Sequence, residues 1–290
     1  MLKRLALGTV QFGLSYGVAN QGGQVGREEA AAILEHARAA GVDTLDTAVA
    51  YGDSEQRLGE IGIEQWQVIS KLPAIPDSCV DIADWVHQSV LDSMKRLRIP
   101  KLHGLLLHRP QQLLGPQGDA LYRALVELKA EGKVDGIGVS IYGPEELDAL
   151  LPRYPLDVVQ APFNILDRRM ATSGWLAKLR RSGTEVHVRS AFLQGLLLMD
   201  QTSRPKYFRR WQDFWELWDR WLAAQELSPL RACIGFALSQ PEVSRVVVGV
   251  DSLRQLKEIL AVAEALAIMP PDTLMSDDGD LINPSRWSVH

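Results

Sequence analysis

The sequence lacks the features that mark secreted, membrane-spanning and nucleic-acid-binding proteins. Its only two cysteines, Cys79 and Cys233, lie far apart and form neither a disulfide framework nor a zinc-type spacing, so we expect a reducing, cytoplasmic location. No apolar run reaches the roughly 18 residues that a membrane helix needs. Charge of one sign is also scarce, because 36 acidic residues nearly balance 31 basic ones and the net charge is −5. A mildly acidic chain of this kind is not expected to bind nucleic acid or an anionic membrane.

Several catalytic patterns are absent as well. None of the six histidines follows a His-x-His or His-Glu-x-x-His pattern, so we expect no metal. No Gly-x-Ser-x-Gly pattern occurs, which disfavours a serine hydrolase. The apolar start of the chain, residues 1–7, ends at Gly8 and Thr9 before it reaches signal-peptide length, and we expect it to form the first strand.

What the sequence does contain is a regular alternation of strand-like and helix-like segments. Eight short, almost continuously apolar runs have the composition of strands covered on both faces, and they span residues 4–9, 44–46, 67–72, 104–108, 136–140, 157–160, 185–190 and 245–250. Helical patterns fall at residues 27–40, 82–98, 119–131, 144–151, 168–181, 208–225, 229–239 and 252–265. This alternation, with no break in composition, predicts a single-domain (β/α)8 barrel over residues 1–290. An open doubly wound sheet is the alternative, and it lacks the Gly-x-Gly-x-x-Gly that would follow its first strand.

Polar residues stand where the predicted strands end, which is where barrel enzymes carry their chemistry. Asp46, Lys71 and His108 end the second, third and fourth strands, and Tyr51 follows in a loop. A buried lysine requires a partner, which Asp46 can provide. An ammonium beside a phenol favours the phenolate, so Tyr51 could exchange a proton near neutral pH, while His108 could orient a substrate oxygen. A lone Asp–Lys pair is often structural, but the four residue types together favour a catalytic site.

One segment resembles a known family. Residues 41–55, which read GVDTLDTAVAYGDSE, closely resemble the Asp-Thr-Ala…Tyr-Gly-x-Ser-Glu signature of the aldo-keto reductases, and the strands that end in Lys71 and His108 resemble the lysine and histidine strands of that family. The resemblance covers nearly the whole chain. It implies a (β/α)8 fold and the NAD(P)H-dependent reduction of a small-molecule aldehyde or ketone to an alcohol. It also implies that Tyr51 donates the proton, that Asp46 and Lys71 tune it, and that His108 orients the carbonyl.

The resemblance, together with positions at strand ends and in the loop after the first strand, gives a set of residues expected around a nicotinamide cofactor and its substrate. The cofactor residues are Thr9, Ser140, Gln160, Arg189, Ser190, Phe192, Leu193, Gln194, Gly195, Gly249, Ser252, Gln255 and Glu258. The substrate residues are Gln11, Tyr16, Arg109, Asn164 and Trp287. For Trp287, anchoring of the C-terminal segment is an equal alternative.

Three positions depart from the family pattern. Arg189 stands where an aromatic residue usually stacks on the nicotinamide. A guanidinium there could stack on the ring and favour its neutral reduced form. Alternatively, it could hold an anionic substrate group or form a structural salt bridge. Arg109 replaces a tryptophan that many members carry, so we expect a polar, sugar-like or anionic substrate. Asp251 stands where many members bind the 2′-phosphate of NADP with a basic residue, although Arg254 could supply that cation one helical turn later. Family habit favours NADPH, with NAD as the alternative.

Two other functions stay open at this stage. A barrel with this site could sense nicotinamide nucleotides and regulate a partner with little turnover. Alternatively, Lys71 could form a Schiff base in an aldolase, which would require a neutral and unpaired amine. A stripe of aromatic residues at helical spacing, from Trp211 to Trp221, is expected to pack on the barrel or on a neighbouring subunit, and the sequence leaves the oligomeric state open.

Overall fold

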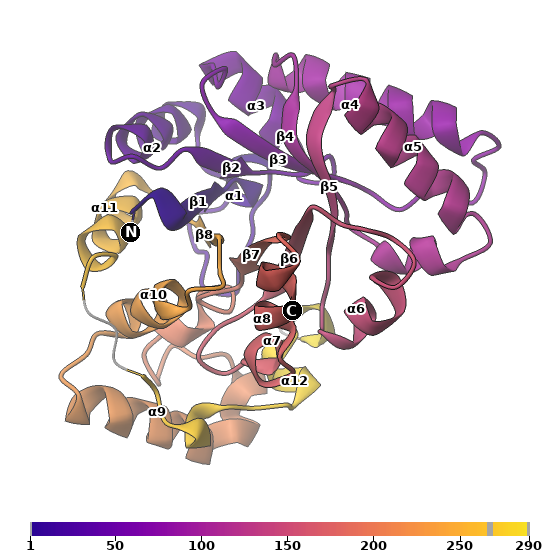
Figure 1. Cartoon of the computed structure of the whole chain (residues 1–290). Helices are drawn as coiled ribbons and strands as arrows, with labels where there is room; N and C mark the ends of the chain where they lie inside the picture. The colour runs from indigo at the N-terminus through magenta and orange to yellow at the C-terminus, as the bar shows by residue number, and fades with distance from the viewer. Residues whose placement is uncertain (1, 266–268, 289–290) are drawn as a thin grey trace.

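The computed structural model of the chain describes residues 2–265 and 269–288. Eight parallel strands form a closed barrel in which each strand pairs with the next and β8 pairs with β1 (Figure 1). The strands are β1 (Leu5–Gly8), β2 (Thr44–Asp46), β3 (Gln67–Leu72), β4 (Leu102–Leu107), β5 (Val134–Ser140), β6 (Val158–Pro162), β7 (Glu185–Arg189) and β8 (Arg245–Gly249). The closed barrel confirms the predicted (β/α)8 architecture and excludes the open doubly wound sheet.

Helices surround the barrel on its outside (Figure 1). The α-helices are α1 (Val10–Gly13), α2 (Arg27–Ala39), α3 (Ser54–Ile61), α4 (Ile82–Leu97), α5 (Gly118–Ala130), α6 (Glu145–Leu150), α7 (Arg169–Thr172), α8 (Trp175–Arg181), α9 (Gln212–Ala224), α10 (Pro229–Ser239), α11 (Leu253–Val262) and α12 (Gly279–Ile282). The 3-10 helices are η1 (Leu2–Arg4), η2 (Pro110–Leu114), η3 (Leu196–Leu198), η4 (Lys206–Trp211), η5 (Asp272–Leu274) and η6 (Pro284–Arg286). The side chains of Asp81, Ser228 and Ser252 cap α4, α10 and α11 by accepting hydrogen bonds from first-turn amides.

Two helix predictions need correction, and one helix is missing from the predictions. Residues 168–181 form two helices, α7 and α8, because Gly174 between them adopts a left-handed conformation with φ of 78°. The first part of the segment 208–225 is the 3-10 helix η4, so α9 begins at Gln212. Helix α3 is absent from the prediction, since two of its buried residues, Ser54 and Glu55, are polar and break the apolar periodicity.

A small apolar cluster, separate from the main core, supports the end of the barrel that carries the polar residues. Ile69 of β3, Leu106 of β4 and Val158 of β6 are buried against one another. Two residues further along the same strands stand Lys71, His108 and Gln160. Because side chains two residues apart point to the same face of a strand, the cluster forms a packed layer directly beneath these three polar side chains.

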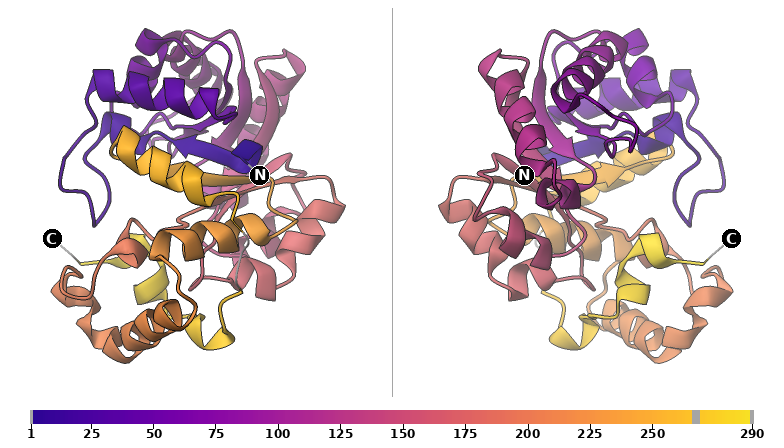
Figure 2. Two further views of the ribbon diagram at one scale, coloured as in Figure 1. Left: turned by 90° about the vertical axis from the view of Figure 1, so that its left-hand side faces the viewer. Right: turned by 90° about the vertical axis from the view of Figure 1, so that its right-hand side faces the viewer.

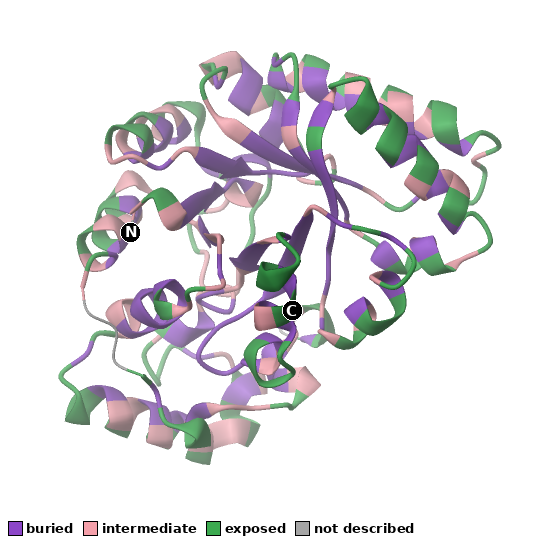
Figure 3. Cartoon of the chain, viewed as in Figure 1, coloured by how far each residue is buried: buried purple, intermediate pink, exposed green. Residues whose placement is uncertain are grey.

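The main core lies between the strands and the surrounding helices, whose outer faces are exposed (Figure 3). Trp215 and Trp218 of α9 are buried, so the aromatic stripe packs into the protein, with α9 against η4 and η5. The C-terminal segment lies near α9 (Figures 1 and 2), where Trp287 packs edge-on against Phe208 with ring centroids 4.8 Å apart. Over residues 2–265 and 269–288, no helix combines the length and apolar character needed to cross a bilayer.

Candidate active site

The ends of β2, β3 and β6 meet at one buried ion pair. Lys71 Nζ donates hydrogen bonds to Asp46 Oδ1 at 2.6 Å and to the Thr47 carbonyl oxygen at 2.9 Å, and it lies 3.4 Å from Tyr51 Oη. Gln160 Nε2 donates to the other carboxylate oxygen of Asp46 at 2.6 Å. The lysine is fully buried, and its three donor protons match these three acceptors. The structure therefore brings Asp46, Lys71 and Tyr51 together, as the sequence predicts.

Two glycines in neighbouring turns hold the backbone of Tyr51 in place. Gly52 has a φ of 56°, and a Cβ atom there would lie 2.5 Å from the Gly13 carbonyl oxygen. A Cβ atom on Gly13 would in turn collide with the Tyr51 carbonyl oxygen. The end of α1 and the turn before α3 thus pack closely because neither glycine has a side chain. This contact fixes the position from which the Tyr51 phenol reaches Lys71.

Electrostatic interactions keep Lys71 charged. Burial alone lowers the pKa of Lys71, but the Asp46 carboxylate and the Tyr51 phenol act in the opposite direction, and the net shift of this pKa is upward. A protonated ammonium therefore faces the Tyr51 hydroxyl at neutral pH. A Schiff-base aldolase needs a neutral, unpaired amine, so this geometry does not support that alternative.

His108 follows β4 directly and stands beside Tyr51. Its amide donates to the Leu72 carbonyl oxygen at 3.1 Å, and the His108 and Tyr51 rings lie 5.7 Å apart between centroids. Burial lowers the pKa of His108 to about 3, and the Lys71 ammonium adds to this shift. The imidazole is therefore neutral at pH 7, and it can donate one hydrogen bond to an oxygen held next to Tyr51.

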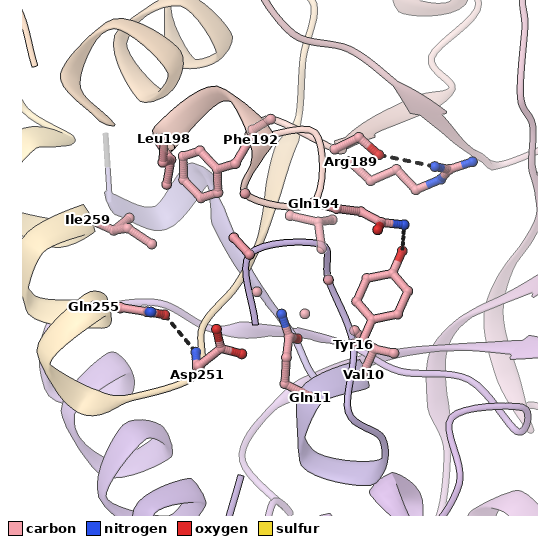
Figure 4. A pocket seen from close by; sticks show the side chains of 18 of the residues that line it. Val10, Gln11, Tyr16, Arg189, Phe192, Gln194, Leu198, Asp251, Gln255 and Ile259 are labelled. Atoms are coloured by element: carbon pink, nitrogen blue, oxygen red, sulfur yellow. Dashed lines mark hydrogen bonds between the residues drawn. The ribbon is translucent and has the colours of Figure 1, made fainter. Parts of the chain in front are cut away.

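A cavity of about 630 Å³ adjoins these residues and extends to α11, and part of it is drawn in Figure 4. Its volume lies within the range of small-molecule and cofactor sites. The predicted site residues that line it are Thr9, Gln11, Tyr16, Asp46, Tyr51, His108, Ser140, Gln160, Arg189, Ser190, Phe192, Gln194, Gly195, Gly249, Gln255 and Glu258. Strand ends and loops that are far apart in the sequence thus face one space.

Three other predicted residues support the cavity without lining it. Lys71 and Leu193 are completely buried behind the lining side chains. Ser252 accepts a hydrogen bond from the Gln255 amide at 3.3 Å and so begins α11. Leu193 and Ser252 therefore support the cavity from behind, while Lys71 reaches it through Tyr51 Oη.

The structure does not bring three of the predicted substrate residues into the cavity. Arg109 is exposed and lies outside the lining. Asn164 is buried, and its Nδ2 donates to the Ser190 carbonyl oxygen at 3.1 Å, so it holds the loop after β7. Trp287 packs on Phe208 and donates from Nε1 to the Leu281 carbonyl oxygen at 3.2 Å, which corresponds to the anchoring alternative.

Several lining residues were missed by sequence reasoning. They are Gly8, Val10, Gly17, Ala19, Tyr142, Ala191, Leu198, Met199, Ser228, Pro229, Leu230, Val247 and Ile259. Tyr142 stands two residues beyond the end of β5 and would follow from a longer window at each strand end. Residues 228–230 begin α10, and no local pattern indicates that this helix start faces the cavity. In the two described ranges, no group of three or more His, Cys, Asp or Glu side chains has a metal-binding arrangement.

The loop between α1 and α2 crosses the cavity and contacts the loops after β7 and β8. Gln194 Nε2 donates to Tyr16 Oη at 3.1 Å, as Figure 4 shows, and the Ala19 amide donates to the Gln194 carbonyl oxygen at 3.4 Å. Asn20 Nδ2 donates to Asp251 Oδ1 at 2.9 Å. The cavity is therefore bridged between its catalytic end and α11.

The turn after β7 presents backbone groups to the cavity in an unusual conformation. Leu193, Gln194 and Gly195 have successive positive φ values of 50°, 55° and 87°. Among the backbone hydrogen bonds of the described chain, none is donated by the amides of residues 191, 192 and 194. Free amides grouped in such a turn form a concave site suited to an anion.

Comparison with known proteins agrees with this geometry. Residues 4–270 match the model of the Aldo/keto reductase family. A D-threo-aldose 1-dehydrogenase from a Pseudomonas species is 28% identical over 84% of this chain and 87% of its own. An NADH-specific methylglyoxal reductase from Escherichia coli (strain K12) is 25% identical over 90% of this chain and 89% of its own. The solved holo form of an aldo-keto reductase from Bacillus halodurans, 22% identical, shares the fold with a TM-score of 0.74 over 91% of this chain and 88% of that one. The chain therefore belongs to the aldo/keto reductase family, whose members are oxidoreductases that use nicotinamide cofactors and act on small-molecule carbonyl compounds.

Proposed function

We propose that this protein reduces an aldehyde or ketone to an alcohol with NAD(P)H, and that Tyr51 donates the proton. The observation that supports this most strongly is the hydrogen-bonded series Asp46, Lys71 and Tyr51, which reaches the cavity next to a neutral His108. A regulatory barrel that only senses the nucleotide has no need of a proton donor coupled to a buried ion pair, so we place turnover ahead of sensing.

The cavity residues fit a nicotinamide dinucleotide in their donors, acceptors and shape. Gln11 Oε1 is buried and has no hydrogen-bond partner in the described chain, so it is an acceptor available to a bound group. Gly249 leaves room beside it, because a Cβ atom there would lie 2.5 Å from Gln11 Nε2. The free amides of the turn at residues 190–195 suit a pyrophosphate, and the cavity continues from them to Gln255 and Glu258 on α11.

The chemistry follows from where the protein places its charges. When bound, a nicotinamide cofactor would supply the hydride that adds to the carbonyl carbon. His108, being neutral, donates a hydrogen bond to the carbonyl oxygen and orients it. As negative charge grows on that oxygen, Tyr51 Oη transfers its proton to it, and the alcohol forms. The Lys71 ammonium, 3.4 Å from Tyr51 Oη, stabilises the phenolate that remains, and Asp46 holds this ammonium in place.

The charges at the α11 end favour NADH over NADPH, although family habit alone favours NADPH. Asp251 and Glu258 both line this end, and Arg254 is the lining cation there. The Arg254 side chain is 82% exposed and lies 3.9 Å from Glu258 Oε1, so it is already partly neutralised. An acidic residue at this place favours a ribose 2′-hydroxyl and repels a 2′-phosphate. The NADH-specific relative supports the same preference.

We infer a small polar carbonyl compound as the substrate, with an aldose-like or anionic aldehyde preferred to a large hydrophobic one. Arg189 lines the catalytic end of the cavity, where its positive charge suits a polar or anionic substrate. The names of two relatives, an aldose dehydrogenase and a methylglyoxal reductase, indicate substrates of this kind for those proteins.

The test is a titration of tryptophan fluorescence with NADH and NADPH, followed by turnover with sugar-like, anionic and hydrophobic aldehydes. Tyr51→Phe should keep nucleotide binding and lose about 10²–10⁴-fold in kcat. Tyr122→Phe, which removes a hydroxyl bonded to the Pro155 carbonyl oxygen outside the cavity, is the matched control and should retain full turnover. Binding without turnover on any aldehyde would favour the sensing function, and no binding of either nucleotide would refute the proposed function.

A further inference from the structure

Among the residues that line the catalytic end of the cavity, one positive charge has no carboxylate partner. The Lys71 ammonium and the Asp46 carboxylate form a 2.6 Å ion pair and cancel each other. His108 is neutral at pH 7, because burial lowers its pKa to about 3. Arg189 is the remaining charged residue of the cavity lining at this end, and Asp251, Glu258 and Arg254 all line the α11 end.

The groups that hold the Arg189 guanidinium are all uncharged. Its Nη2 donates to the Ile141 carbonyl oxygen at 2.9 Å, and its Nη1 donates to Ser190 Oγ at 3.3 Å. The guanidinium lies 5.0 Å from the centroid of the Tyr142 ring. In the described part of the chain no carboxylate oxygen comes within 4.0 Å of it, so the structural salt bridge considered from the sequence does not form.

The Arg189 charge acts on the space in which the reaction takes place. Arg189 is half-buried at the end of β7 and lines the same cavity as Tyr51 and His108. After burial and the Lys71 ammonium, the charge of Arg189 is a further factor that lowers the pKa of His108, followed by that of the exposed Arg109. A positive charge that disfavours the imidazolium form of His108 also disfavours any other cation placed between Arg189 and His108, because the Coulomb interaction does not depend on the chemical group.

Building on the proposed function, we propose that Arg189 makes the cavity discriminate between the two redox states of its nicotinamide cofactor, with tight binding of the reduced form and weak binding of the oxidised form. The ring that exchanges a hydride beside Tyr51 and His108 must lie at this end of the cavity. That ring is neutral when reduced and carries a positive charge when oxidised. The fixed guanidinium therefore repels only the oxidised ring, which weakens the binding of the oxidised cofactor and favours its release.

The expected size of the effect follows from the Coulomb interaction of two like charges. At contact distance the repulsion corresponds to about a fivefold change in Kd in fully aqueous surroundings and to far more at a partly buried site. The Arg189 side chain is half-buried, so we expect an increase of at least about tenfold in the ratio of Kd for the oxidised form to Kd for the reduced form.

The experiment measures this ratio for the whole protein by calorimetric titration with NADH and NAD+, and with NADPH and NADP+. Arg189→Met and Arg189→Gln remove the charge, and the glutamine keeps a donor for the Ile141 carbonyl oxygen. Arg189→Lys keeps the charge. Arg254→Met removes a lining cation at the α11 end and serves as the matched control, which should change the affinity of both redox states by the same factor.

We expect the Met and Gln variants to lower the ratio at least about tenfold, while the Lys variant keeps it within about threefold of the wild type. A ratio that stays within about twofold in both neutral variants, with nucleotide binding retained, would overturn the inference and leave the proposed function intact. Equal lowering of the ratio in the Lys and Met variants would also overturn the inference and leave the proposed function intact, because the charge at position 189 would then not affect the ratio. Failure of the wild-type protein to bind either nucleotide would overturn the proposed function, and the inference with it.

Discussion

The buried Asp46–Lys71 pair gives a prediction whose sign can be worked out in advance. Asp46→Asn removes the negative charge but leaves Lys71 in a site where the lysine side chain is 0% exposed and that of the aspartate 6%. Removing one partner of such a pair leaves an uncompensated buried charge and destabilises a protein by about 3–5 kcal/mol. The new amide also turns a donor toward Gln160 Nε2, which donates to Asp46 in the wild type. We therefore expect a loss near the upper end of this range.

The pH dependence separates this mechanism from a general weakening of the fold. In the wild type the folded-state pKa of Lys71 is raised, so its contribution to stability is present below the unfolded pKa of about 10.4 and is lost as pH rises through the folded pKa. In the variant, burial acts without the carboxylate and lowers the pKa of Lys71 below its unfolded value. The unfolded state then binds more protons, so the stability of the variant rises with pH toward about pH 10.

The assay is urea unfolding from pH 7 to pH 11, followed by tryptophan fluorescence. The control is Asp135→Asn, which removes the partner of Lys101 from a pair that is 47% exposed on both sides and should cost less than about 1 kcal/mol. The reasoning is refuted if Asp46→Asn costs no more than this control. It is also refuted if the stability of Asp46→Asn falls with alkaline pH in parallel with that of the wild type.

Three further predictions concern single residues. Because burial lowers the pKa of His108 to about 3, stability should fall as pH drops from about 6.5 to 3, and His108→Gln should reduce this fall in urea midpoints measured across that range. Gly52→Ala combines a φ of 56° with a backbone collision, so we expect a loss of about 1–3 kcal/mol and a displaced Tyr51 with reduced kcat, measured by urea unfolding and steady-state kinetics. Burial raises the pKa of the Cys233 thiol, so a thiol reagent should label only the half-buried Cys79 in the native protein and both cysteines after unfolding.

A specific result would contradict each of these three predictions. An unchanged acid slope in His108→Gln would show that the imidazole is not held neutral by its surroundings. Gly132→Ala is the matched control for Gly52→Ala, since Gly132 has a φ of 73° with open space around it, and equal losses of kcat would contradict the link to Tyr51. Labelling of two thiols in the native protein at equal rates would contradict the burial of Cys233.

The sequence was sufficient to predict the barrel and the meeting of Asp46, Lys71 and Tyr51. Eight apolar runs predict the closed sheet, and the carboxyl ends of its parallel strands must then lie at one end of the barrel. Residues located by a strand end were therefore placed together without knowledge of any loop. Lys71 and Gln160 illustrate this, since 89 positions separate them and both bind the carboxylate of Asp46.

The rest depended on packing between distant loops, which leaves no local pattern. Trp287 faces Phe208 instead of the cavity, because the path of the C-terminal segment is set by contacts with η4. Asn164 turns its amide toward the Ser190 carbonyl oxygen, although its position after β6 suits a substrate residue equally well. The position of Arg189 at the site follows from the sequence. The absence of a carboxylate near its guanidinium depends on all the loops at the carboxyl ends of the strands.

The pairing of β1 with β8 also has a consequence for biosynthesis. The register joins Leu5 to Val246 and Gly8 to Gly249, so the first strand gains its second neighbour only after nearly the whole chain has left the ribosome. Until then the nascent sheet has two open parallel edges, which other chains can pair with. Arg4, just before β1, donates to the carbonyl oxygens of Leu238 and Val243, so the N-terminal segment is secured by residues that are synthesised late. Premature termination before β8 would therefore release a chain with two unpaired strand edges and an incomplete cavity.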